Sequence, residues 1–254
     1  MDSNQPRSSI TLPGAIIIAA ALIAIAIIWV KKPISVPSTN KTAQNSQLDD
    51  VNMLPVTAAD HILGNPNAEI KIVEYSDPSC PYCKSFNSVM EQVITQYGPG
   101  GKVAWIYRSF PLDKPGTRPN NGILHPNAGH EAQAMECAAF LGGNDKFWAF
   151  EKHFYETTPS VTSDTPDGLD QTTLPQLAKD VGLDPVSFNS CLSSGQFKNK
   201  VEAQYTDGIN AGVSGTPYNI IITPAGSKIP LAGGTSLATM KKTIDALLTE
   251  TTSQ

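Results

Sequence analysis

The sequence predicts an α/β fold in two halves with an inserted all-helical segment, preceded by one transmembrane helix. The first half has the pattern of strand, helix and strand, and the second that of a β-hairpin followed by a helix. Residues 111–212, between these halves, show helical spacing of apolar residues without a strand pattern. The net charge of −5 is spread without long runs, so composition gives no indication of nucleic-acid binding.

The N-terminal part is expected to form a polar tail, an anchor and a linker. Residues 11–30, after the tail 1–10, are uncharged and almost wholly apolar, and a membrane span needs about 17–25 such residues. We predict an uncleaved transmembrane anchor there. A cleaved signal peptide is the alternative, but the small-residue motif at 24–26 lies inside the apolar run. Residues 31–55 are rich in Ser, Thr, Asn, Gln and Pro and are expected to be a flexible linker.

The charges around the anchor do not settle its orientation. Arg7 precedes the span and Lys31 and Lys32 follow it, which by the positive-inside rule places the folded part in the cytoplasm. The bias is only about one charge, and long domains translocate largely regardless of it. The cysteine chemistry below favours the opposite side. We therefore expect a single-pass protein of the cell membrane with its catalytic domain on the extracytoplasmic side.

The two α/β halves are expected at 56–110 and 213–248. The first contains an entry segment and then strand, helix and strand, whose connection predicts parallel strands and a right-handed crossover. The second contains a hairpin and a last helix before the tail 249–254. The expected elements of both halves are the entry segment 58–64, strands 70–75 and 103–110, helix 84–97, strands 218–223 and 228–231, and helix 236–248.

The inserted segment begins with a Pro/Gly/Asn-rich loop at 111–126. His125 and His130 flank this loop, which is expected near the active site, and no histidine has the spacing of a metal ligand set. The aromatic residues of 147–155 are expected to pack in the core rather than bind a cofactor. The predicted elements of the segment are helices 128–141, 144–157, 174–181, 185–192 and 196–211, with a polar loop at 160–173.

A reactive site is expected at the C-x-x-C motif from Cys80 to Cys83, where the first strand ends and its helix begins. Unpaired N–H groups and positive potential at the helix N-terminus stabilise a thiolate, and the pKa of such a cysteine falls from roughly 8.5 into the ~3.5–7.5 range. We predict a redox pair in which Cys80 is the more exposed nucleophile and Cys83 its less exposed partner. Half of a zinc site, or two ordinary cysteines, are the alternatives.

Several motifs together resemble the DsbA-like thiol:disulfide oxidoreductases of the membrane-tethered kind. The resemblance covers about 56–248 and implies a thioredoxin fold, βαβ then ββα, with a helical domain between its halves. Its specific part is the combination of C-x-x-C with a distant Gly-Thr-Pro. The motifs that carry it are 64–68 (GNPNA), 74–83 (EYSDPSCPYC), 108–112 (RSFPL), 136–138 (ECA) and 212–217 (GVSGTP).

The resemblance implies roles for the residues around the cysteines. Thr216 and Pro217 match the loop whose cis proline faces the active site and exposes backbone for an extended substrate; an ordinary trans proline is the alternative. Pro81 and Tyr82 would tune the potential, which we expect between roughly −120 and −230 mV. Pro-Tyr in this position is shared with glutaredoxins.

Glu74 lies on a strand expected to be buried, so its pKa should be raised. In the family an acid at this position relays protons to the inner cysteine; a partly exposed or hydrogen-bonded structural acid is the alternative. Ser76, Asp77 and Lys84 are expected on the surface. Some relatives have a second disulfide, which here would join Cys137 and Cys191 and add roughly 4 kcal/mol; two reduced core thiols are the alternative.

The leading hypothesis is a dithiol oxidase that forms disulfides in exported proteins, without metal or other cofactor. The resemblance implies reduced or misoxidised exported proteins as substrates and a quinone-linked membrane enzyme as reoxidase, and we expect a monomer. A disulfide reductase or isomerase, a module that binds a soft metal or iron–sulfur cluster, and a peptide-binding chaperone are the alternatives.

Overall fold

The computed structural model describes residues 51–159 and 168–251. The expected tail 1–10, the anchor 11–30 and the linker up to residue 50 lie outside the described residues. Within the two described ranges, no helix is both long and apolar enough to cross a bilayer.

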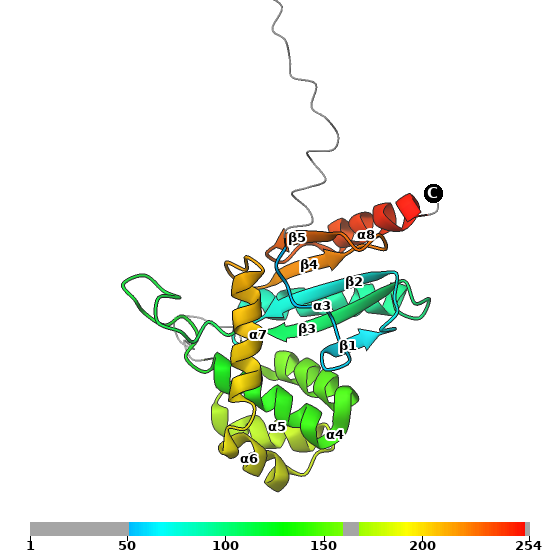
Figure 1. Ribbon diagram of the computed structural model, residues 1–254. Coiled ribbons are helices and arrows are strands. Elements are labelled where there is room, and N and C mark those ends of the chain that lie inside the picture. The colour runs from blue at the N-terminus through cyan, green and yellow to red at the C-terminus, as the bar shows by residue number, and fades with distance from the viewer. Residues whose placement is uncertain (1–50, 160–167, 252–254) are drawn as a thin grey trace, which may run out of the picture. The chain divides into compact units, whose positions relative to one another are not determined.

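A five-stranded sheet in the order β1-β3-β2-β4-β5 forms the centre of the fold (Figure 1). The central pair β2 and β3 is parallel, as predicted, and all other neighbours are antiparallel. The strands are β1 (His61–Gly64), β2 (Ile70–Ser76), β3 (Val103–Ser109), β4 (Tyr218–Ile222) and β5 (Lys228–Ala232). The predicted order of βαβ, helices and ββα is confirmed.

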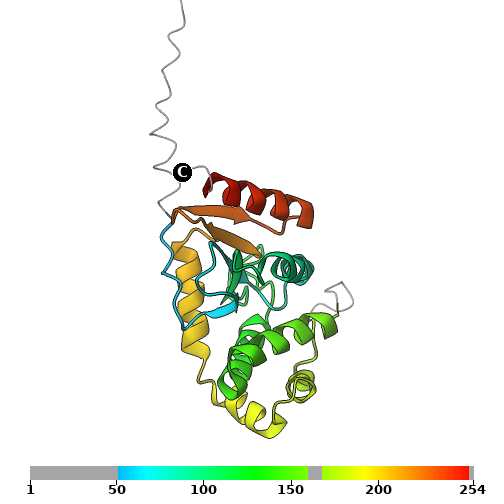
Figure 2. The same ribbon diagram turned by 90° about the vertical axis from the view of Figure 1, so that its right-hand side faces the viewer.

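Helices cover both faces of this sheet. Figure 2 shows α7 along one face and α3 and α8 along the other, with the remaining helices beyond the edge that β1 forms. The α3 face carries the larger hydrophobic core, and the α7 face a smaller one. The helices are α3 (Pro81–Tyr97), α4 (Ala128–Thr157), the 3₁₀ turn η1 (Gln171–Thr173), α5 (Leu174–Asp180), α6 (Pro185–Ser194), α7 (Lys198–Asn210) and α8 (Leu237–Thr251).

The alternation of side chains along β2 decides which of them reach the active site. Ile70 and Ile72 belong to the core on the α3 face, whereas Val73 and Tyr75 belong to the core on the α7 face. Because successive side chains of a strand point to opposite faces, Glu74 lies on the α3 side. Period-two alternation thus directs its carboxyl group toward the helix that carries the cysteines.

The inserted segment largely follows the predicted helices. A break separates the two halves of α4 at Gly143, whose φ of 77° interrupts the helix between the predicted segments 128–141 and 144–157. The expected core role of the aromatic run is confirmed, because Phe147, Phe150 and Phe154 are fully buried. Of the predicted polar loop 160–173, residues 160–167 lie outside the described residues and the last three form η1.

One helix assigned to the insertion also covers the sheet. A Cβ atom added to Gly208 of α7 would lie 2.5 Å from Cδ2 of Phe110, so only glycine allows the helix to approach this closely. The boundary at residue 212 therefore does not separate two structural units. Helical periodicity alone cannot show this, since it does not tell which layer a helix covers.

The edges of the predicted segments also differ. The entry segment forms β1, which pairs with β3 although four residues show no clear alternation. Residues 51–55, expected in the linker, pack on the folded unit because the buried Arg108 donates hydrogen bonds to the carbonyls of Leu54 and Pro55. The last helix continues to Thr251, beyond the expected end at 248.

Candidate active site

The two cysteines of the motif lie at the start of α3 in different surroundings. Cys80 is the N-cap residue and Pro81 follows it in the first turn, where a missing N–H costs no helical hydrogen bond. No side chain caps this N-terminus, so its N–H groups remain directed at the Cys80 sulfur region. Both thiols are free; Cys80 is 4% exposed and Cys83 fully buried. The expected order of exposure holds, but Cys80 reaches solvent only through a groove.

The groove beside Cys80 has a volume of about 660 Å³. Its walls come from the start of α3, the segment after β3, α7 and the loop before β4, and are mostly apolar. Tyr82, 71% exposed, lies at its rim. The lining residues include Cys80, Phe110, Leu112, Tyr205, Ile209 and Thr216.

The Thr216–Pro217 peptide bond is cis and lies opposite the cysteines. The carbonyl oxygen of Thr216 is 3.5 Å from Cys80 Sγ and accepts a hydrogen bond from the thiol. The structure therefore brings together the two motifs that the sequence separates most widely, C-x-x-C and Gly-Thr-Pro.

Cys80 is an acidic thiol. The hydrogen bond with Cys83, together with smaller effects of Thr216 and the backbone of Cys83, lowers the pKa of Cys80 to about 6 against the opposing effects of burial and the charge of Asp77. At neutral pH the sulfur of Cys80 is therefore largely a thiolate, the form that attacks and leaves in disulfide exchange.

Cys83 has the opposite character. Burial, the nearby sulfur of Cys80 and the carboxylates of Glu74 and Asp77 raise the pKa of Cys83 well above its ordinary value. Its sulfur is 3.5 Å from the backbone N–H of Asp77. The inner thiol thus keeps its proton and needs a base to release it.

Glu74 is a buried acid whose charge acts on Cys83. It is 1% exposed and accepts hydrogen bonds from Ser76 Oγ at 2.7 Å and Trp105 Nε1 at 2.9 Å. Burial, with a smaller effect of the charge of Cys80, raises the pKa of Glu74 to about 7 despite these two donors. The predicted burial and raised pKa are confirmed, and the hydrogen bonds of the alternative hypothesis are also present.

The expectation that Ser76 and Asp77 lie on the surface is wrong, because both are fully buried. Asp77 accepts hydrogen bonds from the backbone N–H of Ser79 at 2.8 Å and of Leu112 at 2.7 Å, and its Oδ2 lies 2.9 Å from His125 Nδ1. Their burial follows from the segment after β3, which folds back over the end of β2. Lys84 is partly buried and donates to the carbonyl of Thr158.

His125 brings an imidazole group to the wall of the groove that Cys80 also lines. Burial opposes its charge, but the hydrogen bond and charge of Asp77 outweigh burial and, with the charge of Cys80, raise the pKa of His125. The sequence placed His125 near the active site without giving it a partner. His125 and Asp77 are 48 residues apart in the sequence, and no local pattern predicts their contact.

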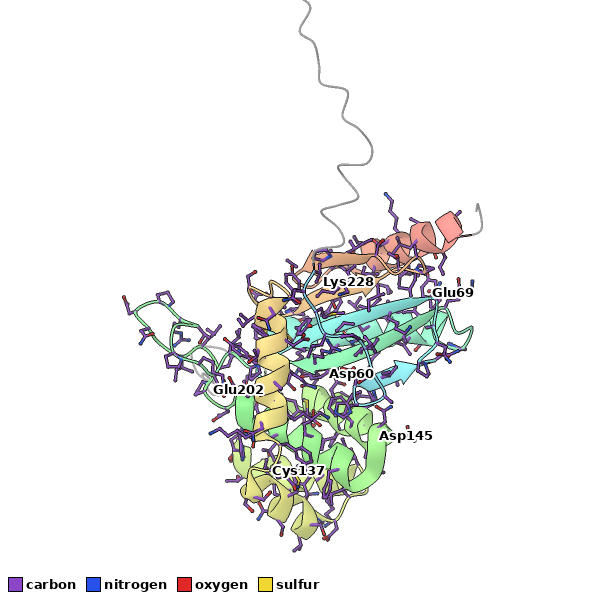
Figure 3. All side chains as sticks on the ribbon, in the orientation of Figure 1. Asp60, Glu69, Cys137, Asp145, Glu202 and Lys228 are labelled. Atoms are coloured by element: carbon purple, nitrogen blue, oxygen red, sulfur yellow. A yellow bond between two sulfur atoms is a disulfide. The ribbon has the colours of Figure 1, made fainter. Side chains whose placement is uncertain are left out.

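The other two cysteines form a disulfide away from the groove. Cys137 of α4 and Cys191 of α6 are bonded with an S–S distance of 2.04 Å, and Figure 3 places Cys137 among the inserted helices. This leaves Cys80 and Cys83 as the free thiols. No cluster of three or more His, Cys, Asp or Glu in the described ranges is arranged to hold a metal.

Similarity to known proteins agrees with this arrangement. A family model described as thioredoxin matches residues 57–246. The crystal structure of α-DsbA1 from Wolbachia pipientis aligns with a TM-score of 0.64 at 23% identity, covering 78% of this chain and 94% of that one.

Two curated proteins are also similar in sequence. "Probable disulfide bond formation protein D" of Bacillus anthracis is 25% identical over 176 residues, which are 68% of this chain and 74% of that protein. Na(+)/H(+) antiporter NhaA 1 of Mycolicibacterium gilvum is 33% identical over 89 residues, 35% of this chain, and this chain spans only 12% of its length. The chain belongs to the thioredoxin family and has the DsbA-like fold with a helical insertion.

Proposed function

We propose that this protein is a DsbA-like thiol:disulfide oxidoreductase that acts as a dithiol oxidase on exported proteins. The observation that carries the proposal is the contrast within the pair: a Cys80 with a pKa of about 6 at a groove, and a sealed Cys83 whose pKa is raised. A stabilised thiolate favours the reduced pair, so the oxidised pair readily accepts electrons. The name of the Bacillus anthracis relative agrees with disulfide formation.

The proposed reaction starts from the Cys80–Cys83 disulfide. A substrate thiolate attacks the Cys80 sulfur; a mixed disulfide forms, and Cys83 leaves and takes a proton. The second thiolate of the substrate then attacks the substrate sulfur that is bonded to Cys80, and Cys80 leaves as a thiolate. The substrate is oxidised by two electrons and the pair is reduced by two. Glu74 is the proposed donor and acceptor of the Cys83 proton.

The groove fits an extended segment of an unfolded protein. Thr216 presents its backbone beside the Cys80 sulfur, and apolar side chains such as Phe110 and Ile209 line the walls. Backbone contacts bind without regard to sequence, and apolar walls favour chains whose core is not yet formed. Broad selectivity for reduced, partly folded proteins is therefore the proposed specificity.

For location and partners, the proposal rests on the sequence. The apolar stretch 11–30 would anchor the protein with its catalytic domain outside the membrane. Each cycle leaves the Cys80–Cys83 pair reduced by two electrons, which an oxidant must remove. A membrane enzyme linked to quinones is the proposed reoxidase. The catalytic unit would work as a monomer.

The test is oxidation of a reduced two-cysteine peptide by the purified protein with its pair oxidised. We expect stoichiometric peptide oxidation that Cys80→Ser abolishes and that the exposed substitution Ser85→Ala leaves unchanged. A titration against glutathione should give a potential above about −230 mV. A potential below about −270 mV would instead establish a reductase, and a stoichiometric metal after anaerobic purification would establish the metal-binding alternative.

A further inference from the structure

A second acid is buried behind the cysteines, on the inserted helix α4. Glu151 is 1% exposed, and the amide of Asn87 from α3 donates a hydrogen bond to its Oε1 at 2.5 Å. Burial of a carboxyl group without a cationic hydrogen-bond partner is costly unless the group holds a proton. Glu151 contacts neither cysteine, and the reaction described above does not use it.

Glu151 lines a cavity of about 230 Å³ that is separate from the substrate groove. Trp105 connects this cavity to the active site, because it lines the cavity and donates its Nε1 hydrogen to Glu74. At the other end are Lys152 and Glu91, partly exposed side chains that form an ion pair of 2.5 Å. The cavity therefore leads from beside the buried acids to the surface between α3 and α4.

The cavity can hold water. Its volume exceeds the roughly 30 Å³ that a water molecule occupies in the liquid, and water enters cavities that offer polar partners. Glu151 is one such partner. Another is Trp148, whose buried Nε1 has no hydrogen-bond partner within the part of the chain that the structure describes.

Buried hydroxyl groups lie near both acids, because Tyr107 and Tyr155 each interact electrostatically with Glu74 and Glu151. Ser76 Oγ donates to Glu74 and lies 3.3 Å from Tyr155 Oη. Tyr107 Oη lies close to Tyr155 and has no hydrogen bond of normal geometry in the described ranges. A hydroxyl can accept one proton while it donates another, so such groups carry protons between acids that do not touch.

The two acids influence each other electrostatically. Burial first, and then the charges of Glu74 on β2 and Glu91 on α3, raise the pKa of Glu151 well above its ordinary value, against the smaller effects of Asn87 and of Lys152 on its own helix. Two buried carboxyl groups that repel each other do not ionise together and behave as one titrating pair. A proton removed from one is readily supplied by the other.

We propose that Glu151 and the cavity beside it connect the proton of Cys83 to solvent, by a route separate from the substrate groove. This inference rests on the proposed exchange reaction. When Cys83 leaves as a thiolate, Glu74 gives it a proton, Glu151 reprotonates Glu74 through the hydroxyl groups, and cavity water reprotonates Glu151. Reoxidation runs the same transfers backwards. A bound substrate closes the groove to water, and this second route stays open.

The first experiment compares Glu151→Gln with Glu156→Gln, an exposed acid on the same helix. The reduced protein is reoxidised by oxidised glutathione in single turnovers between about pH 5 and 9. We expect Glu151→Gln to lower the rate about tenfold near pH 7 and to change the shape of the pH profile; the loss is smaller than the roughly 10²–10⁴-fold of a general acid–base step because Glu74 stays in place. The Cys80 titration and the Glu156→Gln profile should match the unmodified protein, and Glu151→Asp should recover part of the rate.

A second variant tests the cavity without altering either acid. Ala149 lines the cavity, and Ala149→Leu would fill it; we expect the same loss near pH 7. An unchanged Glu151→Gln profile, or an equal slowing at every pH, would overturn the relay. If both variants keep the pH profile of the unmodified protein while peptide oxidation persists, the proton relay is overturned and the proposed oxidase function stands. A changed profile in a protein that only reduces disulfides supports the relay and overturns the oxidase assignment.

Discussion

The two sides of the C-x-x-C motif differ more than their separation by two residues suggests. On the outer side, Cys80 faces a groove, is hydrogen-bonded to Cys83 and Thr216, and has a pKa of about 6. On the inner side, Cys83 is sealed among carboxyl groups that raise its pKa. Burial and negative charges raise the pKa at both positions, so the difference comes from the hydrogen bonds that lower the pKa of Cys80 at the helix start. One helical turn is enough to separate an attacking sulfur from a proton-holding one.

The largest effect of pH on stability is expected to disappear when the inner acid is removed. Glu74 has a pKa of about 7 in the folded protein, above its ordinary 4.5, so the folded state binds its proton more tightly. Its contribution is complete below about pH 4.5 and is lost as pH rises to about 7, a fall of about 3 kcal/mol in the free energy of unfolding. Glu74→Gln keeps the size of the side chain and one acceptor oxygen for Trp105, removes the titrating group and should remove that fall. Urea unfolding at pH 4.5 and 8 with the pair reduced measures it.

Glu131 provides the control for this measurement, because burial also raises its pKa to about 7 while it accepts a hydrogen bond from Ser79 and its charge is not among those that act on Cys83. Glu131→Gln should flatten the same pH interval and leave the exchange rate of Cys83 unchanged. Should Glu74→Gln leave the pH dependence of unfolding as it was, the inner side would not be the proton-holding environment described above.

A smaller effect is expected on the outer side, from His125→Ala. The charge of Asp77 raises the pKa of Cys80, and His125 compensates that charge through a contact of 2.9 Å. Without the imidazole, the pKa of Cys80 should rise by about one unit, a tenfold loss of thiolate near pH 5. The ultraviolet absorbance of the thiolate against pH measures this.

The matched substitution is His130→Ala, on the same segment but exposed and paired with Gln171. It should leave the Cys80 titration unchanged. If the two variants titrate alike, Asp77 is neutralised by other groups and the outer side owes its acidity to Cys83 and the helix alone.

The smallest effect on the thiols is expected from the remote disulfide. Replacing Cys137 and Cys191 by Ala removes a cross-link between positions 54 residues apart and should cost about 4 kcal/mol of stability. Neither residue contacts the groove or the buried acids, so the Cys80 pKa should not move. A shifted thiolate titration in the folded variant would show that the insertion acts on the motif from a distance.

The sequence predicted the parts of the site that local patterns encode. The C-x-x-C motif at a strand–helix junction located Cys80 and Cys83. The expected burial of the strand predicted that the pKa of Glu74 is raised, because burying a carboxylate costs free energy. Asp77 was misplaced because its burial depends on Leu112 and His125, which return from beyond β3. Glu151 escaped notice because its aromatic neighbours in the sequence indicated only core packing. Contacts between segments that are far apart in the chain produce no periodic pattern of residues in the sequence, so they could not be predicted from it.

The place of α7 has a consequence for exchanging parts between proteins of this fold. The helix carries groove residues Tyr205 and Ile209 at one end, while Lys200 at its other end pairs with Glu136 of α4 at 2.6 Å. A hybrid cut at residue 212 would import a foreign groove wall together with the donor's helices. A graft that begins at Ala128 and ends before Lys198 contains none of the groove residues, so it would keep the recipient's own client preferences, and these helices could then diverge without altering what the groove accepts.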